Sequence, residues 1–325
     1  MVTNSQTRGE DAKEIPYRIV FYNVENYFDA KYDSSLTYNE FTPDGNLHWT
    51  QSKYIDKRNS IYKVIKAIGG WNPITLIGLA EIENNYVISD LISNTPLVKE
   101  DYKVVHFESN DTRGIDVALL YSSSRFRLID AQKVVIRDPQ NPYFKTRDIL
   151  YVKGLLKTDT LHVFVNHWTS RYRGYLESEP FRLLASKTLL HLTDSICTIC
   201  ENANIVLMGD FNDNPNNESL ELITKSRLCR FDNMEPIGSI SEIPGTLKYK
   251  DNWLNFDQFF VSNSLTNGSN GLICSPPAKI FDAKFLLEVD LQYLGLKPNR
   301  TNTGFKYHGG TSDHLPIYID IVPVK

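Results

Sequence analysis

The chain has 325 residues, 41% of them hydrophobic, with a formal net charge of -4 and a pI near 6.0. This length and apolar content allow a large buried core. The slightly negative net charge argues against a protein that binds long duplex nucleic acid tightly through many Lys and Arg contacts. It does not exclude a nuclease. No apolar stretch is long enough to span a bilayer, and no internal repeat or low-complexity tract is present.

The N-terminal residues 1–16 are polar and contain no apolar signal core. We therefore expect a flexible N-terminal segment over 1–16, followed by a single catalytic domain over 17–325. Length alone would allow about two domains, but the motifs below are interleaved along the whole chain and favour one. The compartment stays open between an intracellular protein and an exported one whose leader has been removed.

Short apolar runs predict buried strands, and polar residues stand where these runs end. In chain order, the runs and polar positions are 17–22 with Asn23, 74–80 with Glu81, 161–165 with Asn166 and His167, 205–208 with Asp210, and 258–261, which follows Asp257. Polar groups at a sheet rim are where α/β proteins build their sites. The sequence therefore predicts one site assembled from several strand ends.

Helices and loops are expected between these strands. Residues 54–68 have the apolar spacing of an amphipathic helix that ends at Gly69 and Gly70, and a second helix is expected from about 181 to 199. Each leads into one of the predicted strands, which is typical of a layered α/β fold. The polar stretches 29–50 and 262–277 predict long loops, and loops near a site usually determine substrate choice.

Carboxylates recur at these strand ends, namely Glu81, Asp210, Asp257 and Asp313. If they converge, they repel one another unless they are protonated or share a cation. Oxygen ligands suit Mg²⁺ or Mn²⁺, whereas the scarcity of Cys or His pairs at zinc spacing argues against a structural zinc site.

Seven segments resemble, in order, those of the endonuclease/exonuclease/phosphatase superfamily, typified by pancreatic deoxyribonuclease and the exonuclease-III-type abasic-site nucleases. They are FYNVEN (21–26), GLAEIE (78–83), RGIDVA (113–118), NHWTSR (166–171), GDFND (209–213), WLNFDQ (253–258) and SDH (312–314). One such segment can arise by chance, but seven in the family's order are specific. The resemblance implies a two-sheet, four-layer α/β sandwich of the deoxyribonuclease-like type that hydrolyses phosphoester bonds with a divalent metal.

The resemblance also implies roles at the metal. Glu81 is similar to the principal metal ligand, and Asn23 to the group beside it that orients metal or phosphate. Asp313 is expected to complete the metal and phosphate environment. The implied cofactor is Mg²⁺, with Mn²⁺ as a second possibility.

The catalytic roles implied by the resemblance fall on five residues. Asp210 resembles the group that orients or deprotonates the attacking water, and Asn212 a neighbour that donates to a phosphoryl oxygen. Asp257 and His314 resemble a carboxylate and histidine dyad, in which the aspartate fixes the tautomer of the imidazole. His167 matches the histidine that deoxyribonuclease-type members keep near the leaving oxygen. The sequence leaves open which histidine serves the leaving group.

Substrate contacts are expected from cations in or beside the motifs. Arg171 is favoured because it lies one short loop beyond His167, and Arg113 could also meet a phosphate oxygen, although solvated surface charge is the alternative for such residues. Lys145, Arg147 and Arg173 belong to the same set. For Asp116, a supporting hydrogen bond is as consistent with the sequence as a substrate contact.

The four cysteines are Cys197, Cys200, Cys229 and Cys274. Cys197 and Cys200 fall on one face of a predicted helix, where spacing by three is ordinary packing, and no second Cys-x-x-Cys is present. The sequence thus favours neither a disulfide nor a redox or metal site here, and it does not fix the compartment.

Three classes of function compete. His167 and the Asn-His-Trp-x-Ser-Arg form favour a nuclease, so the expected partner is a phosphate-containing substrate, with nucleic acid first, and no protein partner is implied. The alternative is a phosphatase or phosphodiesterase acting on small phosphates or lipid headgroups, as inositol-phosphatase-like and sphingomyelinase-like relatives do. A binding protein on an inactive scaffold would require the loss of a key ligand, and none is missing. The signature segments of calcineurin-type phosphatases are absent.

Overall fold

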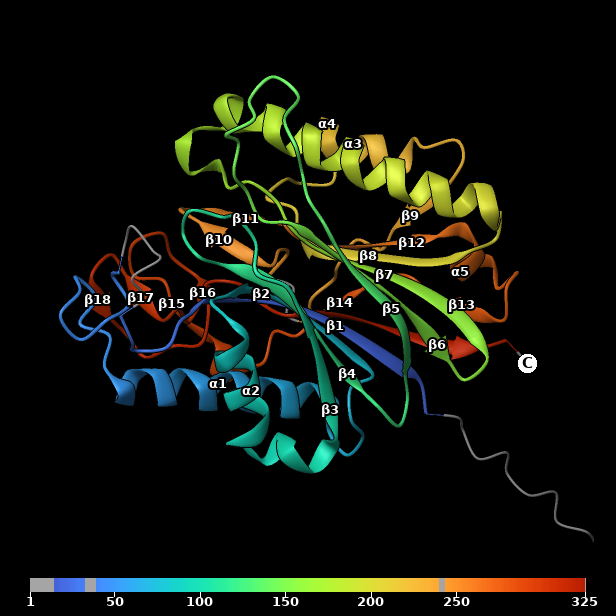
Figure 1. The fold of residues 1–325 in the computed structure, drawn as a ribbon. Coiled ribbons are helices and arrows are strands. Elements are labelled where there is room, and N and C mark those ends of the chain that lie inside the picture. The colour runs from blue at the N-terminus through green and yellow to red at the C-terminus, as the bar shows by residue number, and fades with distance from the viewer. Residues whose placement is uncertain (1–14, 33–38, 240–242, 325) are drawn as a thin grey trace, which may run out of the picture.

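The computed structural model describes residues 15–32, 39–239 and 243–324. Two large sheets pack face to face, with helices on both outer sides (Figure 1). Helices α1 (Gln51–Gly69) and α2 (Asn85–Ser93) lie outside one sheet, and α3 (Tyr175–Ile199) and α4 (Glu218–Thr224) outside the other. The expected two-sheet, four-layer α/β sandwich is confirmed. Residues 1–14 of the expected flexible segment lie outside the described residues.

The first sheet joins the beginning and the end of the described chain. Its order is β13 (Leu272–Cys274), β19 (Ile317–Pro323), β1 (Tyr17–Tyr27), β2 (Leu76–Ile82), β4 (Asp116–Ser122) and β3 (Tyr102–His106), with β14 (Lys279–Ile280) also on β19. β1 runs antiparallel to β19, with Tyr17 opposite Ile321, and parallel to β2.

The second sheet carries the central segment of the chain. Its order is β5 (Arg127–Val134), β6 (Ile149–Leu156), β7 (Asp159–His167), β8 (Asn204–Asp210), β12 (Asp257–Ser262) and β9 (Phe231–Asn233). β7 and β8 are parallel and place His167 opposite Asp210, while β12 is antiparallel to β8 and places Asp257 opposite the same residue. Three predicted site residues therefore stand at one end of this sheet.

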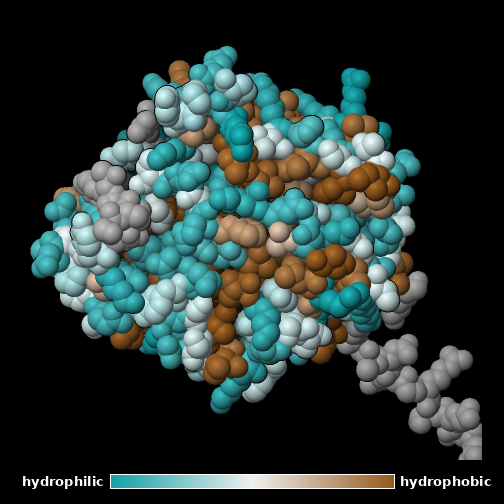
Figure 2. All heavy atoms as spheres, viewed as in Figure 1, coloured by the Kyte–Doolittle hydropathy of each residue, from teal (hydrophilic) through white to brown (hydrophobic). Residues whose placement is uncertain are grey.

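The remaining elements are short. They are the strand pairs β10 (Leu247–Tyr249) with β11 (Asn252–Leu254), β15 (Leu287–Val289) with β16 (Leu296–Pro298) and β17 (Asn302–Thr303) with β18 (Lys306–Tyr307), the helix α5 (Asn263–Asn267), and 3-10 turns at Pro96–Glu100, Arg171–Arg173 and Lys284–Leu286. None of the helices in the described part of the chain combines the length and apolarity needed to cross a bilayer. Hydrophilic side chains cover most of the face shown in Figure 2, and hydrophobic ones break it only in patches.

The main core lies between the sheets, where a glycine of one sheet faces a methionine of the other. Gly78 on β2 faces Met208 of β8, and a Cβ at Gly78 would lie 2.7 Å from the Met208 Cε. Because interiors are packed at crystal density, a side chain there would have to displace the flexible end of Met208. Glu81 and Asp210 lie at the ends of the same two strands.

The predicted helices are present with shifted ends. α1 begins at Gln51 because the Thr50 side chain accepts a hydrogen bond from Lys53 N, which caps the first turn. α3 begins at Tyr175, before the predicted 181, because its first residues include Pro180 and lack the regular apolar spacing that would reveal a helix. The described part of 29–50 contains no helix or strand, as expected.

Two expectations are corrected. Residues 262–277 are not simply a loop, because they contain α5 and β13, and β13 is fixed by pairing with β19, with Cys274 opposite Ile321. Cys197 and Cys229 form a disulfide, with Cα atoms 5.6 Å apart, whereas Cys200 and Cys274 are free. Both features arise from long-range contacts that local spacing does not encode.

Candidate active site

Two bulges present the acidic residues of the first sheet. Asn23 of β1 pairs with Ala80 of β2, and the next pair is Tyr27 with Ile82. β1 therefore carries extra residues between these two pairs. β2 is irregular at the same level in its pairing with β4. Glu25, Asn26 and Glu81 all have positive φ, at 51°, 51° and 64°.

Left-handed backbone is uncommon for residues other than glycine and collects at functional sites. Here it re-aims side chains that would otherwise alternate across the sheet. The Asn26 N–H donates to Glu81 Oε2 at 2.8 Å, which fixes the Glu81 carboxylate at the rim. Asn212, in the turn after β8, has a φ of 52° and its N–H donates to Asp210 Oδ1 at 2.9 Å.

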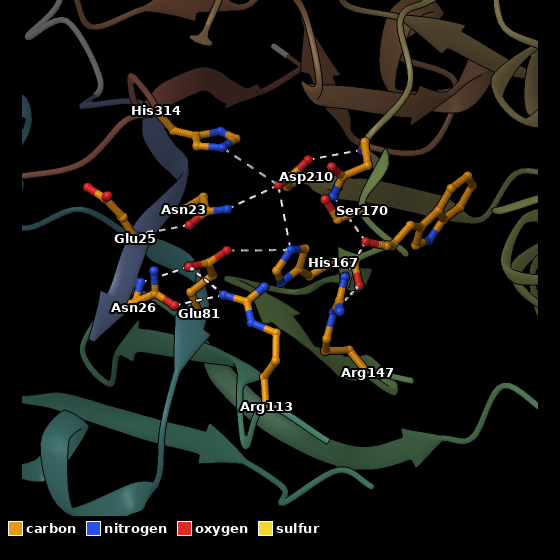
Figure 3. Close-up of polar contacts among 12 residues, drawn as sticks. Asn23, Glu25, Asn26, Glu81, Arg113, Arg147, His167, Ser170, Asp210 and His314 are labelled. Carbon is orange, nitrogen blue, oxygen red and sulfur yellow. Dashed lines mark hydrogen bonds and ion pairs between the residues drawn. The ribbon is translucent and has the colours of Figure 1, made fainter. Parts of the chain in front are cut away.

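Asp210 is the point on which the site converges (Figure 3). Its Oδ2 accepts from Asn23 Nδ2 at 3.0 Å and lies 3.6 Å from His167 Nε2 and 3.9 Å from His314 Nε2. Burial, together with the charge of Asp257, raises the pKa of Asp210 to about 7, against the opposing charge of His314. The two sheets therefore bring an amide and two imidazoles to one carboxylate.

His314 is fixed from behind. Its Nδ1 lies 2.7 Å from Asp257 Oδ2, and its backbone N–H donates to Ser312 Oγ, which in turn donates to the carbonyl of Asn23. Burial alone would lower the pKa of His314, but the charge and hydrogen bond of Asp257, with Asp210, raise it well above its usual value. Nε2 is left pointing toward Asp210 (Figure 3).

His167 has a different environment. Burial, with the charges of Arg147 and Arg113, holds its pKa well below its usual value. Arg147 donates to the carbonyls of His167 and Trp168, and Asn166 accepts a hydrogen bond from the Trp168 ring. Within this motif, Asn166 and Trp168 thus support the loop, while His167 faces Asp210 and, at 3.9 Å, Glu81 Oε1.

Asp313 lies at the edge of the site, where it contacts the guanidinium of Arg300. Its Oδ2 accepts from Arg300 Nη2 at 2.9 Å, and the same guanidinium donates to Glu25 Oε1 at 3.0 Å. Although burial pushes the other way, Arg300 and His314 lower the pKa of Asp313. Sequence reasoning missed Glu25 and Arg300: Glu25 lies inside a recognised segment, whereas nothing local singles out Arg300.

The three predicted substrate contacts are placed differently. Arg113 lies at the cleft, where Nη2 donates to Asn26 Oδ1 at 2.7 Å and is 3.6 Å from Glu81 Oε2. Arg171 instead supports the turn after β8, donating to Asn212 O and to the side chains of Asp213 and Asn217. Asp116 is buried on β4, beside His106. Of these three, the structure brings only Arg113 to the cleft, where Lys145 and Arg147 of the expected set of cations also lie.

The cleft lies along the end of the two sheets that carries Glu81 and Asp313, and it consists of two adjoining hollows of about 960 and 720 Å³. Both are lined by Glu25, Asn26, Arg113 and Arg300, so they form one groove. Glu81 and Asp313 line the larger hollow. Such a groove is at or above the usual size of a small-molecule pocket.

The donor set fits a hard divalent cation. Glu81, Asp210, Asn23 and Asp313 supply carboxylate and amide oxygens, which are the ligands that Mg²⁺ and Mn²⁺ prefer. Asp210, Asp257 and His314 also have ligand atoms close enough to surround an ion. Carboxylates this close together are stable only with a proton or a cation between them.

A family model that spans nearly the whole chain gives the class: the protein is a phosphoester hydrolase. A family model described as "Endonuclease/Exonuclease/phosphatase family" matches residues 18–322. The chain belongs to this family, whose enzymes use divalent metals and act on phosphate-containing substrates.

Solved structures show the same fold at low identity. The endonuclease/exonuclease/phosphatase from Bacteroides vulgatus has a TM-score of 0.61 and 14% identity, covering 96% of this chain and 100% of that one. The mannosyl-6-phosphatase of Bacteroides thetaiotaomicron has 0.59 and 14%, covering 94% and 99%. D. rerio TDP2, complexed with single strand DNA product, has 0.57 and 14%, covering 95% and 100%. No curated protein matches the chain.

Proposed function

We propose that this protein is a Mg²⁺-dependent phosphodiesterase that cleaves nucleic acid, with Mn²⁺ as an alternative cation. One observation carries the proposal: Nε2 of His314 and Nε2 of His167 lie 3.9 and 3.6 Å from the same Asp210 oxygen, and their neighbours Asp313 and Glu81 line the groove. A phosphoryl group in that space would meet a carboxylate able to orient water and imidazoles able to move a proton.

Each residue then has a distinct task. Asp210 orients the attacking water. The Asn212 amide donates one N–H to the carbonyl of Trp168, and its second N–H can donate to a phosphoryl oxygen. His314, fixed by Asp257 and with a raised pKa, carries the proton that the leaving oxygen needs. His167, whose pKa is lowered, is neutral and would donate a hydrogen bond to the phosphoryl group.

Glu81 would hold the cation, with Asn23 and Asp313 completing its surroundings. When bound, the cation neutralises charge on the non-bridging phosphoryl oxygens. Arg113, 3.6 Å from Glu81 Oε2, is placed to contact the same phosphate from the side. Arg171 supports the turn that carries Asn212, so its influence on the substrate would be indirect.

Nucleic acid is favoured by the form of the groove. Tyr143 and Tyr172, which line the larger hollow, are 87% and 96% exposed. Bases of a single strand stack on such rings without sequence preference, and each stack contributes about 1–3 kcal/mol. An extended groove with aromatic rings near the catalytic residues suits a chain of nucleotides better than a compact headgroup.

A second candidate is a phosphatase or phosphodiesterase acting on small phosphates or lipid headgroups. It is favoured by charge, because carboxylates outnumber cations among the residues that line the larger hollow. A polyanion is normally tracked by many cations. A substrate with one phosphoryl group needs only the cation and Arg113.

A substrate panel tests the proposal. Plasmid DNA, single-stranded DNA, RNA, bis-nitrophenyl phosphate, a sugar phosphate and phosphoinositides would be incubated with Mg²⁺ or Mn²⁺, with Asp210→Asn as the inactive control. We expect cleavage of a polynucleotide that is lost in the control. If small phosphates are hydrolysed and every polynucleotide stays intact, the nuclease proposal is rejected in favour of the second candidate.

A further inference from the structure

Arg300 occupies the space between two acidic side chains of the site. Its Nε and Nη2 both donate to Glu25 Oε1, at 3.2 and 3.0 Å, and Nη2 also donates to Asp313 Oδ2 at 2.9 Å. Glu25 is only 4% exposed. A buried carboxylate without a counter-charge is costly. Burial and the charge of Asp313 raise the pKa of Glu25 to about 7, while the charges of Lys57 and Arg300 oppose this rise, and only Arg300 also bonds to Asp313.

The loop that carries Arg300 is fixed from below by a buried lysine. Lys57, on α1, is 2% exposed and donates to Thr301 Oγ1 and to the carbonyl of Thr311. The Thr301 N–H donates to Glu25 Oε2 at 2.8 Å. Contacts from a helix and a strand therefore hold the guanidinium in place, which distinguishes it from a freely moving surface arginine.

One edge of the guanidinium remains available. Nε and Nη2 bind the carboxylates, whereas Nη1 has no hydrogen-bond partner among residues 15–32, 39–239 and 243–324. Arg300 lines both hollows of the groove, and its side chain is 39% exposed. The free N–H groups are therefore accessible to a ligand in the groove.

We propose that Arg300 is a fixed cation at the Glu25–Asp313 pair, that it limits the site to one divalent cation, and that its Nη1 edge binds a phosphoryl oxygen. Two-metal phosphoesterases place two ions about 3.5–4 Å apart to hold both sides of the phosphoryl group. Here a guanidinium takes one of those places. The inference rests on the proposed cation-dependent function.

Metal stoichiometry tests this without turnover. The metal-free protein would be titrated with Mn²⁺, and free Mn²⁺ measured by electron paramagnetic resonance. We expect the wild type to bind one Mn²⁺ per chain and Arg300→Ala to bind two, because the exposed carboxylate pair then needs a counter-ion. Arg300→Lys keeps the charge and is expected to remain at one.

A double variant shows whether the second ion uses the pair. Arg300→Ala combined with Glu25→Gln is expected to return to one Mn²⁺, since a single carboxylate is a weak site. Circular dichroism would establish that each variant is folded. If Arg300→Ala fails to fold, Arg300→Gln, which also lacks the charge but keeps most of the side chain, takes its place and is expected to bind two Mn²⁺. A wild type that binds two ions, or a folded Arg300→Ala that binds one, overturns the inference.

The free edge is tested with inorganic phosphate as the probe. Binding of phosphate to the Mn²⁺-loaded protein, measured by calorimetry, is expected to weaken about tenfold in Arg300→Lys, which lacks the planar fork. Unchanged phosphate affinity would overturn that part. A wild type that binds no Mn²⁺ at all would reject the proposed function as well, so the two failures are distinguishable.

Discussion

Two groups of side chains each combine two carboxylates with one imidazole but have different surroundings. Asp210, Asp257 and His314 form one, and His106, Glu108 and Asp116 the other, each with ligand atoms within 4.8 Å of one another. The first group combines β8, β12 and the segment before β19, whereas the second belongs to the adjacent strands β3 and β4 and their connection. Residue types alone do not distinguish them.

The difference is the space that each group faces. Beside the first group lies the groove of about 960 Å³, lined by the adjacent Asp313. Asp116 lines a cavity of about 10 Å³, which is near the minimum for a single water. Both Asp116 oxygens are also engaged, by Ser109 N at 2.8 Å and His106 Nε2 at 3.2 Å. We infer that the first group is catalytic and the second structural.

The largest expected effect is at His314. Replacing His314 with Ala removes the imidazole beside Asp210, and losing one preorganised contact costs on the order of a hundredfold to a thousandfold in rate. The measurement is kcat on the substrate that the panel identifies. Mn²⁺ affinity should stay close to wild type. A twofold effect, or an equal loss of metal affinity, would contradict the role given to this residue.

Glu81→Gln should act through the cation. The amide keeps the shape of the side chain but loses the charge that attracts the ion, so half-saturation by Mg²⁺ should rise about tenfold or more, with lower turnover. Activity would be titrated against Mg²⁺ and Mn²⁺ in parallel with direct Mn²⁺ binding. An unchanged metal dependence would mean that Glu81 is not the principal ligand.

Asp116→Asn should separate the second group from catalysis. The asparagine loses the charge beside His106 and one hydrogen-bond acceptor, which we expect to lower the free energy of unfolding by about 1–3 kcal/mol. kcat/KM should stay within about twofold of wild type. Urea unfolding and the standard assay measure these two quantities, and His106→Gln is the matched control. A large loss of activity in a stably folded variant would return Asp116 to the site.

The smallest effect concerns pH. Burial, with the charge of Asp116, raises the pKa of Asp148 to about 6. The folded state therefore binds a proton more readily than the unfolded state, whose aspartate titrates near 3.9. This contribution is fully present below about pH 4 and is lost as pH rises through about 6. Urea midpoints from pH 4 to 7 should show that slope in the wild type and a flatter profile in Asp148→Asn.

The sequence was sufficient for the parts of the site that follow buried strands. Glu81, His167 and Asp210 were predicted because apolar runs stop at them, and the structure brings them together. It was not sufficient where a contact joins distant segments. Arg171 turns to Asp213, and Arg300 reaches Glu25, because of tertiary packing that no local pattern encodes.

The same reasoning applies to backbone conformation. The left-handed φ of Glu81 follows from bulges in two neighbouring strand pairs, and a residue other than glycine gives no sequence signal for it. The Cys197–Cys229 disulfide joins residues 32 apart, and it depends on how the segment after α4 returns to α3. Such features require the fold to be known first.

The pairing of β1 with β19 makes the site sensitive to truncation. β1 and its antiparallel neighbour Ile317–Pro323 lie far apart in the chain, and the first sheet needs both. His314 immediately precedes that last strand. A chain cut before His314 therefore loses the imidazole beside Asp210 and the antiparallel neighbour of β1 together.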